Sequence, residues 1–211
     1  MTGAQAAASL AAAVYGLFLC QRRKQPLFFK ILLYGLISYF FGAVFTAAYA
    51  LVYGAAPVGF HVGYFGHIGM YFFLLSSYYG AMDRLADGGE RAYLRYRLLA
   101  LAAPLCLLAY TGLSVGRMGA AAGLPLIILA LPMVLTLYFA LKHLIFPDVD
   151  MGIIRVMRPY NACVILFCLA EAAALGPLAS PETARFFQGL SCLLLLLLLP
   201  AAEMGVRKWY I

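Results

Sequence analysis

The chain has 211 residues, of which 65% are hydrophobic and only 11% are charged, and its formal net charge is +7 at pH 7. Soluble domains carry about 25% charged residues, so this composition excludes an ordinary soluble domain. Residues 31–82 contain no Lys, Arg, Asp or Glu at all. We therefore expect an all-α, polytopic integral membrane protein that forms one compact bundle.

Seven apolar runs, each about as long as a bilayer-spanning helix, are separated by charged or Pro- and Gly-rich stretches. They predict a bundle of seven transmembrane helices in a single transmembrane domain, residues 1–211. In chain order the spans are about residues 4–20, 27–53, 63–82, 98–115, 120–141, 159–178 and 189–206. The basic residues 22–24 follow the first run, whereas a cleaved signal peptide carries its charges before the apolar run. The first run is therefore expected to be a retained span.

Small residues predict that neighbouring helices approach the second and third spans closely. Ser38, Gly42, Thr46 and Ala50 recur every four residues in the second span, and Gly63, Gly66 and Gly69 open the third. Small side chains at such spacing let two helix backbones approach each other in a membrane.

Four features of the later spans carry further expectations. Pro104 predicts a kink in the fourth span, and residues 180–183 (Ser-Pro-Glu-Thr) resemble a helix N-terminal cap within a loop at residues 179–188. Glu203 precedes Arg207 by four residues, which predicts an ion pair along the helix. The seven consecutive leucines at residues 193–199 are expected to face lipid.

The distribution of positive charge predicts the orientation. With seven spans, all of the 15 Lys and Arg residues except Arg117 and Arg185 fall on one side. The positive-inside rule therefore predicts an N-terminus outside and a C-terminus inside the cell, in the plasma membrane. The same distribution explains the basic charge without nucleic acid, for which no motif is present.

Cysteine and histidine usage gives no sign of a metal or cofactor. The five cysteines lie in apolar stretches without a CxxC pair, which is typical of small core residues. His61 and His67 share one predicted side and His143 the other, too few ligands for a zinc site. We expect no metal and no cofactor.

Glu171 lies well inside the sixth apolar run and is the main candidate site residue. An ionisable side chain at that depth is costly and usually functional, although a protonated, hydrogen-bonded structural carboxyl is the alternative. His67 lies at similar depth below the same face, and its helical face includes Tyr71. Facing residues of the second span add Thr46 and Tyr49. We expect an outward-facing ligand pocket formed by Glu171, His67, Tyr71, Tyr49 and Thr46, with Arg117 as a further candidate.

Short motifs resemble bacterial lysoplasmalogenase-like membrane proteins of the YhhN type. The matching pieces are Gln25-Pro26-Leu27, Gly42-Ala43, Phe60 to Gly63 with His67 and Tyr71, and Ala170-Glu171. Ala43 stands where that family has its first acidic residue, and the family usually has eight spans. The resemblance implies a lipid-active hydrolase in which Glu171 and His67 would be the catalytic acid and base.

Three functions remain open at this point. The first is a sensing or carrier-like protein that binds a small molecule or lipid; any signal would pass to a cytoplasmic protein partner docking on the basic inner loops. The second is the lipid hydrolase, although no nucleophile motif is present. The third is a small transporter, in which an internal repeat would be expected but is not seen. Membrane lipids are the expected partners in each case.

Overall fold

The computed structural model describes residues 2–83, 87–147, 152–176 and 180–209, and these residues form helices and connections without a strand. The predicted end of the sixth span at residues 177–178 lies outside the described residues. The α-helices are α1 (Thr2–Arg22), α2 (Leu27–Tyr53), α3 (Gly63–Ser77), α5 (Leu94–Ala100), α6 (Ala102–Met118), α7 (Ala120–Ile145), α8 (Ile153–Leu175) and α9 (Pro181–Trp209). A π-helical turn, Tyr78–Met82, continues α3, and a 3-10 turn, Arg91–Tyr93, precedes α5.

Six helical segments of the described chain are long and apolar enough to cross a membrane: Gly3–Arg22, Leu27–Tyr53, Arg91–Met118, Ala120–Ile145, Ile154–Leu175 and Glu182–Lys208. The prediction of an all-helical, multi-pass membrane protein is thereby confirmed. The third predicted span differs from these six because its α-helical part, α3, has only 15 residues.

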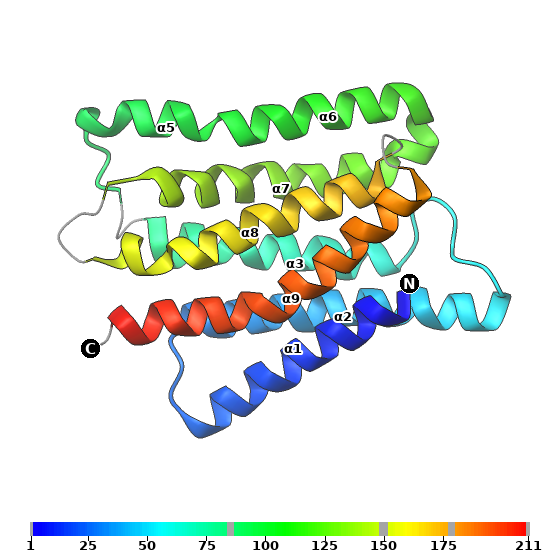
Figure 1. Cartoon of the computed structure of the whole chain (residues 1–211), viewed down its shortest axis with the longest axis horizontal. Coiled ribbons are helices and arrows are strands. Elements are labelled where there is room, and N and C mark those ends of the chain that lie inside the picture. Colours follow the sequence, from blue (N-terminus) through cyan, green and yellow to red (C-terminus); the bar gives the residue numbers. More distant parts are fainter. Residues whose placement is uncertain (1, 84–86, 148–151, 177–179, 210–211) are drawn as a thin grey trace.

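The helices lie roughly along one direction, and the N- and C-termini lie toward opposite ends of the bundle (Figure 1). We call the end where α1 begins the N-terminal end and the other the C-terminal end. Helix α9 packs on α8, α1 and α2, while α7 packs on α3, α6 and α8. Helices α5 and α6 form the outer edge of the bundle and contact mainly α7.

Glycines bring α2 and α3 into backbone contact, so the two helices for which small residues predicted a close neighbour pack against each other. A Cβ on Gly42 would lie 2.4 Å from the carbonyl oxygen of Gly63, and a Cβ on Gly66 would lie 2.5 Å from the carbonyl oxygen of Ser38. The Ser38 hydroxyl also donates a hydrogen bond to the Gly66 carbonyl oxygen, 3.1 Å away. No larger side chain fits between these helices without moving one of them.

Proline and serine set two helix boundaries. The helix that contains Pro104 is interrupted at Leu101, between α5 and α6, because a proline ring clashes with the carbonyl four residues earlier and has no N–H to donate. This confirms the predicted kink. Ser180 caps α9 by accepting a hydrogen bond from the Thr183 N–H at 3.2 Å. The expected loop at residues 179–188 was wrong in extent, because α9 already begins at Pro181.

The leucine run of α9 is only half exposed, so the expectation that it faces lipid was wrong for four of its members. Leu194, Leu195, Leu198 and Leu199 are buried, whereas Leu193, Leu196 and Leu197 are exposed. The reason is the position of α9 between α8 and α1, which covers one side of the helix. Among the cysteines, Cys163 and Cys168 are buried as expected, but Cys106 is exposed on α6.

Gly66→Ala tests whether the α2–α3 contact holds the bundle together. We expect it to lower the free energy of unfolding by about 2 kcal/mol, because the added methyl group meets backbone atoms that cannot rotate away. Gly112→Ala on α6 is the matched control, since a Cβ there meets nothing within 4 Å, and alanine favours a helix by up to about 1 kcal/mol over glycine. Thermal unfolding of both variants measures the difference; equal stabilities would contradict the close contact.

Candidate functional site

Glu171 is buried in α8 and is held by a hydrogen bond from α2. Its side chain is 4% exposed, and the Tyr39 hydroxyl donates to Glu171 Oε1 at 3.0 Å. The Gln5 amide of α1 donates in turn to the Tyr39 oxygen at 3.1 Å. Ser191 of α9 also lies beside the carboxyl. Polar groups from three other helices therefore lie around this one carboxyl, whose burial was predicted from its depth in the apolar run.

A cavity of about 180 Å³ lies next to Glu171, toward the N-terminal end of the bundle. Ala43, Ala56, Pro57, Leu129, Ala174 and Leu175 supply its apolar wall. Its polar lining comes from five helices and one connection: Gln5, Thr46, His61, Tyr64, His67, Glu171 and Gln188. Such a concentration of hydrogen-bonding groups around a hollow is typical of a site that takes a polar ligand or ordered water.

Two histidines give the cavity basic groups opposite the carboxyl. The His67 ring packs edge-on against Tyr39, with ring centroids 4.3 Å apart. His61 Nδ1 accepts a hydrogen bond from the Gly63 N–H at 3.2 Å, and burial lowers the pKa of His61 below its ordinary value. His61 is therefore neutral at pH 7, with its proton on Nε2, so this imidazole is available as a hydrogen-bond donor.

The structure brings together three of the five predicted pocket residues. Glu171, His67 and Thr46 line the cavity. Tyr71 is fully buried beside it and stacks on Phe167, with centroids 5.8 Å apart, but it is not part of the lining. Tyr49 packs on Tyr53, with centroids 4.4 Å apart, near the far end of α2.

The position of Tyr49 follows from the length of α2. The last turn of this helix extends beyond the bundle (Figure 1), and Leu51 there is 86% exposed. Arg117 lies exposed near the end of α6, and it does not line the cavity either.

Four polar residues of the site were not singled out from the sequence: Gln5, Tyr39, Tyr64 and Gln188. Gln5 interrupts the alanine-rich start of the first helix, and Gln188 lies near the start of the last. An amide within an apolar helix is a signal that sequence reasoning can use, because it needs a partner in hydrocarbon. Tyr39 carried no such signal among 15 tyrosines.

A second polar cluster, around Lys142 and His143, occupies the C-terminal end of the bundle. Lys142 is 4% exposed and His143 is 1% exposed. Lys142 Nζ lies 2.6 Å from Asp83 Oδ1 and 2.7 Å from Asp87 Oδ2. Arg97 holds Asp87 in a bidentate pair, with Nε–Oδ2 at 2.8 Å and Nη2–Oδ1 at 2.5 Å. These pairs fasten the connection between α3 and α5 to α7, which is a structural role.

No group of three or more His, Cys, Asp or Glu side chains among the described residues is placed to hold a metal ion. The chemistry available at the cavity is therefore that of a carboxyl, two imidazoles, two amides and hydroxyl groups. These groups form hydrogen bonds with hydroxyl, amine or ester functions, and the carboxyl and the imidazoles exchange protons with hydroxyl and amine groups.

Comparisons with protein-family models, with curated proteins and with solved structures found no match to the chain.

Acid titration tests the cluster around Asp87. Partial burial opposes ionisation of this carboxyl, but hydrogen bonds from Arg97 and Lys142 hold its pKa well below the ordinary value. Its contribution to stability is therefore complete above the unfolded pKa of about 3.9 and is lost as the pH falls further. We expect the melting temperature of Asp87→Asn to be lower than that of the wild type at pH 7 and to fall less between pH 5 and pH 3.

Glu90→Gln is the control for this titration, because Glu90 is exposed in the same connection and only its backbone oxygen accepts a hydrogen bond from Arg97. It should follow the wild-type curve. An Asp87→Asn curve parallel to that of the wild type would show that the ion pairs do not stabilise the fold.

Proposed function

We propose that this protein binds a lipid or lipid-like small molecule in the cavity around Glu171. The observation that supports the proposal is a hollow lined by seven polar side chains within a bundle of apolar helices. Groups of this kind are costly to bury in a membrane, and they are found there mostly where a ligand or ion binds. A carboxyl with a purely structural role would need hydrogen-bond partners but no adjacent cavity.

The dimensions of the cavity and its surroundings favour an amphiphile. About 180 Å³ accommodates a small polar group, whereas pockets for drug-sized ligands have about 300–1,000 Å³. A mostly apolar crevice of about 480 Å³ adjoins the cavity and shares Tyr64 and Leu175 with it. Pro125 and Leu126 of α7 line this crevice. A ligand with its polar end at Glu171 and an apolar part between α3 and α7 fits both.

We further propose that all seven predicted segments cross the membrane. Gly63 to Met82, that is α3 with its π-helical turn, is long enough for about 30 Å at about 1.5 Å per residue. All Lys and Arg residues except Arg117 and Arg185 then lie on the side of the C-terminal end. The positive-inside rule makes that side cytoplasmic in the plasma membrane, so the cavity faces outward.

In this orientation the protein acts as a sensor or carrier. The basic loops at the C-terminal end face the cytoplasm, where they attract anionic lipid and are available to a protein partner. A ligand bound between α2, α3 and α8 would act on these loops through the helices that connect the two ends.

A lipid hydrolase is the second candidate, because Glu171 and His67 line the same cavity and form a possible acid–base pair. Ala43 also lines this cavity, so both positions at which the lysoplasmalogenase-like family carries an acidic residue meet there. Of these two positions, only the one occupied by Glu171 is acidic in this chain. One carboxyl in place of two favours binding over hydrolysis.

Glu171→Gln tests the binding site. Glutamine keeps the shape of the side chain and still accepts the Tyr39 hydrogen bond, so the fold should be retained. We expect about tenfold less of the co-purifying amphiphile, because a hydrogen bond to a charged group contributes about 1.5–3 kcal/mol. Mass spectrometry of lipids and metabolites extracted from protein in lipid nanodiscs measures the amount.

Tyr71→Phe is the matched control, since the Tyr71 hydroxyl is buried without a partner in the described part of the chain and does not line the cavity. The amount of amphiphile that co-purifies with this variant should equal the amount that co-purifies with the wild type. If Glu171→Gln is folded and its extract also equals the wild type, Glu171 is structural and the proposed binding site is wrong.

Incubation with a lysophospholipid separates binding from hydrolysis. A hydrolase that uses the proposed pair should lose about 100-fold or more of its rate in both Glu171→Gln and His67→Gln, the usual cost of removing a general acid or base. Product release followed by mass spectrometry gives the rate. Binding of the lipid without any product from the wild type would leave the sensor or carrier function.

A further inference from the structure

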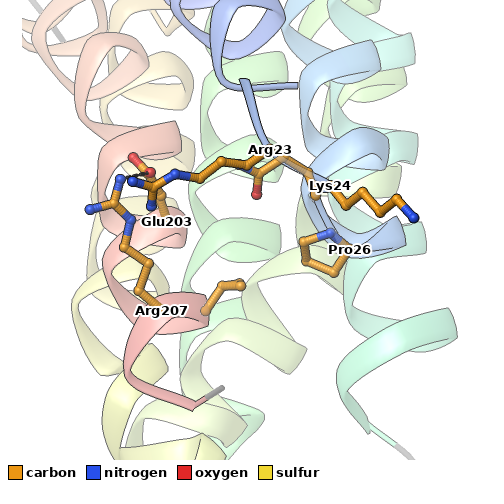
Figure 2. A pocket seen from close by; sticks show the side chains of 7 residues that line it. Arg23, Lys24, Pro26, Glu203 and Arg207 are labelled. Atoms are coloured by element: carbon orange, nitrogen blue, oxygen red, sulfur yellow. Dashed lines mark hydrogen bonds and ion pairs between the residues drawn. The ribbon is translucent and has the colours of Figure 1, made fainter. Parts of the chain in front are cut away.

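A third polar feature lies at the C-terminal end, where the connection between α1 and α2 faces the last turns of α9. A surface pocket of about 370 Å³ is lined there by Arg23, Lys24, Gln25, Pro26, Glu203, Val206 and Arg207. Figure 2 shows Arg23 extending from the connection toward Glu203 and Arg207. This pocket shares no residue with the cavity around Glu171, so it is a separate site.

The carboxylate in this pocket is already neutralised. Arg207 pairs with Glu203, as the spacing of four residues predicted, and the Tyr15 hydroxyl of α1 donates to Glu203 Oε2 at 2.7 Å. Arg23 and Lys24 form no ion pair with any carboxylate in the described part of the chain. The lining therefore holds three basic residues, Arg23, Lys24 and Arg207, against the one carboxylate of Glu203, and the pocket carries an excess of positive charge.

The start of α2 adds to this excess. Pro26 lines the pocket and precedes the first turn of a 27-residue helix that has no side-chain cap. The free amide groups of such a turn carry about half a positive charge and attract anions. Arg23 and Arg207 both line the pocket, and their guanidinium groups match the geometry of phosphate oxygens, to which arginine donates two parallel hydrogen bonds.

The level of the pocket indicates what supplies the anion. Residues 23–26 join two membrane-compatible helices, Gly3–Arg22 and Leu27–Tyr53, so they lie at the boundary of the hydrocarbon layer. Phospholipid phosphates occupy that level, and basic pockets between helices on the cytoplasmic side are known to hold anionic headgroups. We propose that this pocket binds a phosphate group, supplied by the headgroup of an anionic phospholipid or by free phosphate.

The double variant Arg23→Gln with Lys24→Gln tests the site. It leaves the Glu203–Arg207 pair intact and removes no internal ion pair. Each basic side chain at an anionic membrane surface is worth about a factor of five in affinity. We therefore expect the affinity for phosphatidylglycerol, titrated into the detergent-solubilised protein and followed by native mass spectrometry, to fall about 25-fold.

The double variant Arg91→Gln with Arg95→Gln is the matched control, because it removes the same charge from exposed positions at the same end of the bundle. It should change the affinity less than about twofold. Phosphatidylcholine and inorganic phosphate are titrated in parallel. Preference for phosphatidylglycerol identifies the lipid headgroup as the source, while saturable binding of inorganic phosphate that the first variant abolishes identifies free phosphate.

Two results would overturn the proposal. Equal affinity for phosphatidylglycerol and phosphatidylcholine, without binding of inorganic phosphate, would show that the pocket selects neither an anionic headgroup nor free phosphate. An equal loss in both double variants would show that only the general surface charge attracts the lipid. Melting temperatures of both variants verify that each is folded.

Discussion

The hydrogen bond from Tyr39 to Glu171 joins α2 to α8 in the interior of the bundle, and the arrangement of the site depends on it. In an apolar bundle a carboxyl finds no water, so it must be satisfied by side chains from other helices. Tyr39 reaches it from α2, and the glycine contact between α2 and α3 brings His67 against Tyr39. Backbone packing and the polar contacts of the site therefore support each other, because a wider spacing of α2 and α3 would move the His67 imidazole away from Tyr39, the residue that donates to Glu171.

Two buried polar clusters at opposite ends of the bundle differ in how their polar side chains are satisfied. Around Lys142 two carboxylates meet a lysine and an arginine at hydrogen-bonding distance, so charge is matched and little remains for a ligand to supply. Around Glu171 the polar groups border a hollow. Because its charges are matched, the first cluster attaches α7 to the connection between α3 and α5. Because the second cluster borders a cavity, it is a candidate binding site.

The surroundings of the cavity connect it with the membrane. Its neighbouring crevice reaches α7 at Pro125 and is mostly apolar, so the site offers an amphiphile a polar and an apolar compartment side by side. Ala43 faces this cavity without a carboxyl, so Glu171 is the one acidic side chain among the described residues that line it.

Sequence alone determined the class of the protein, the extent of α2 and the close packing at the small residues of α2 and α3, because long apolar runs and glycine spacing act through local geometry; the structure showed that these two helices pack against each other. It also identified Glu171, since an ionisable residue in an apolar run is conspicuous. Only the tertiary structure decided the partners of Glu171: Tyr39 and Gln5 come from other helices, and their rotation about the helix axes depends on packing. For the same reason the leucines of α9 divide between core and surface, and Tyr49 lies outside the cavity. Packing also buries Lys142 beside Asp83, which precedes it by 59 residues in the sequence.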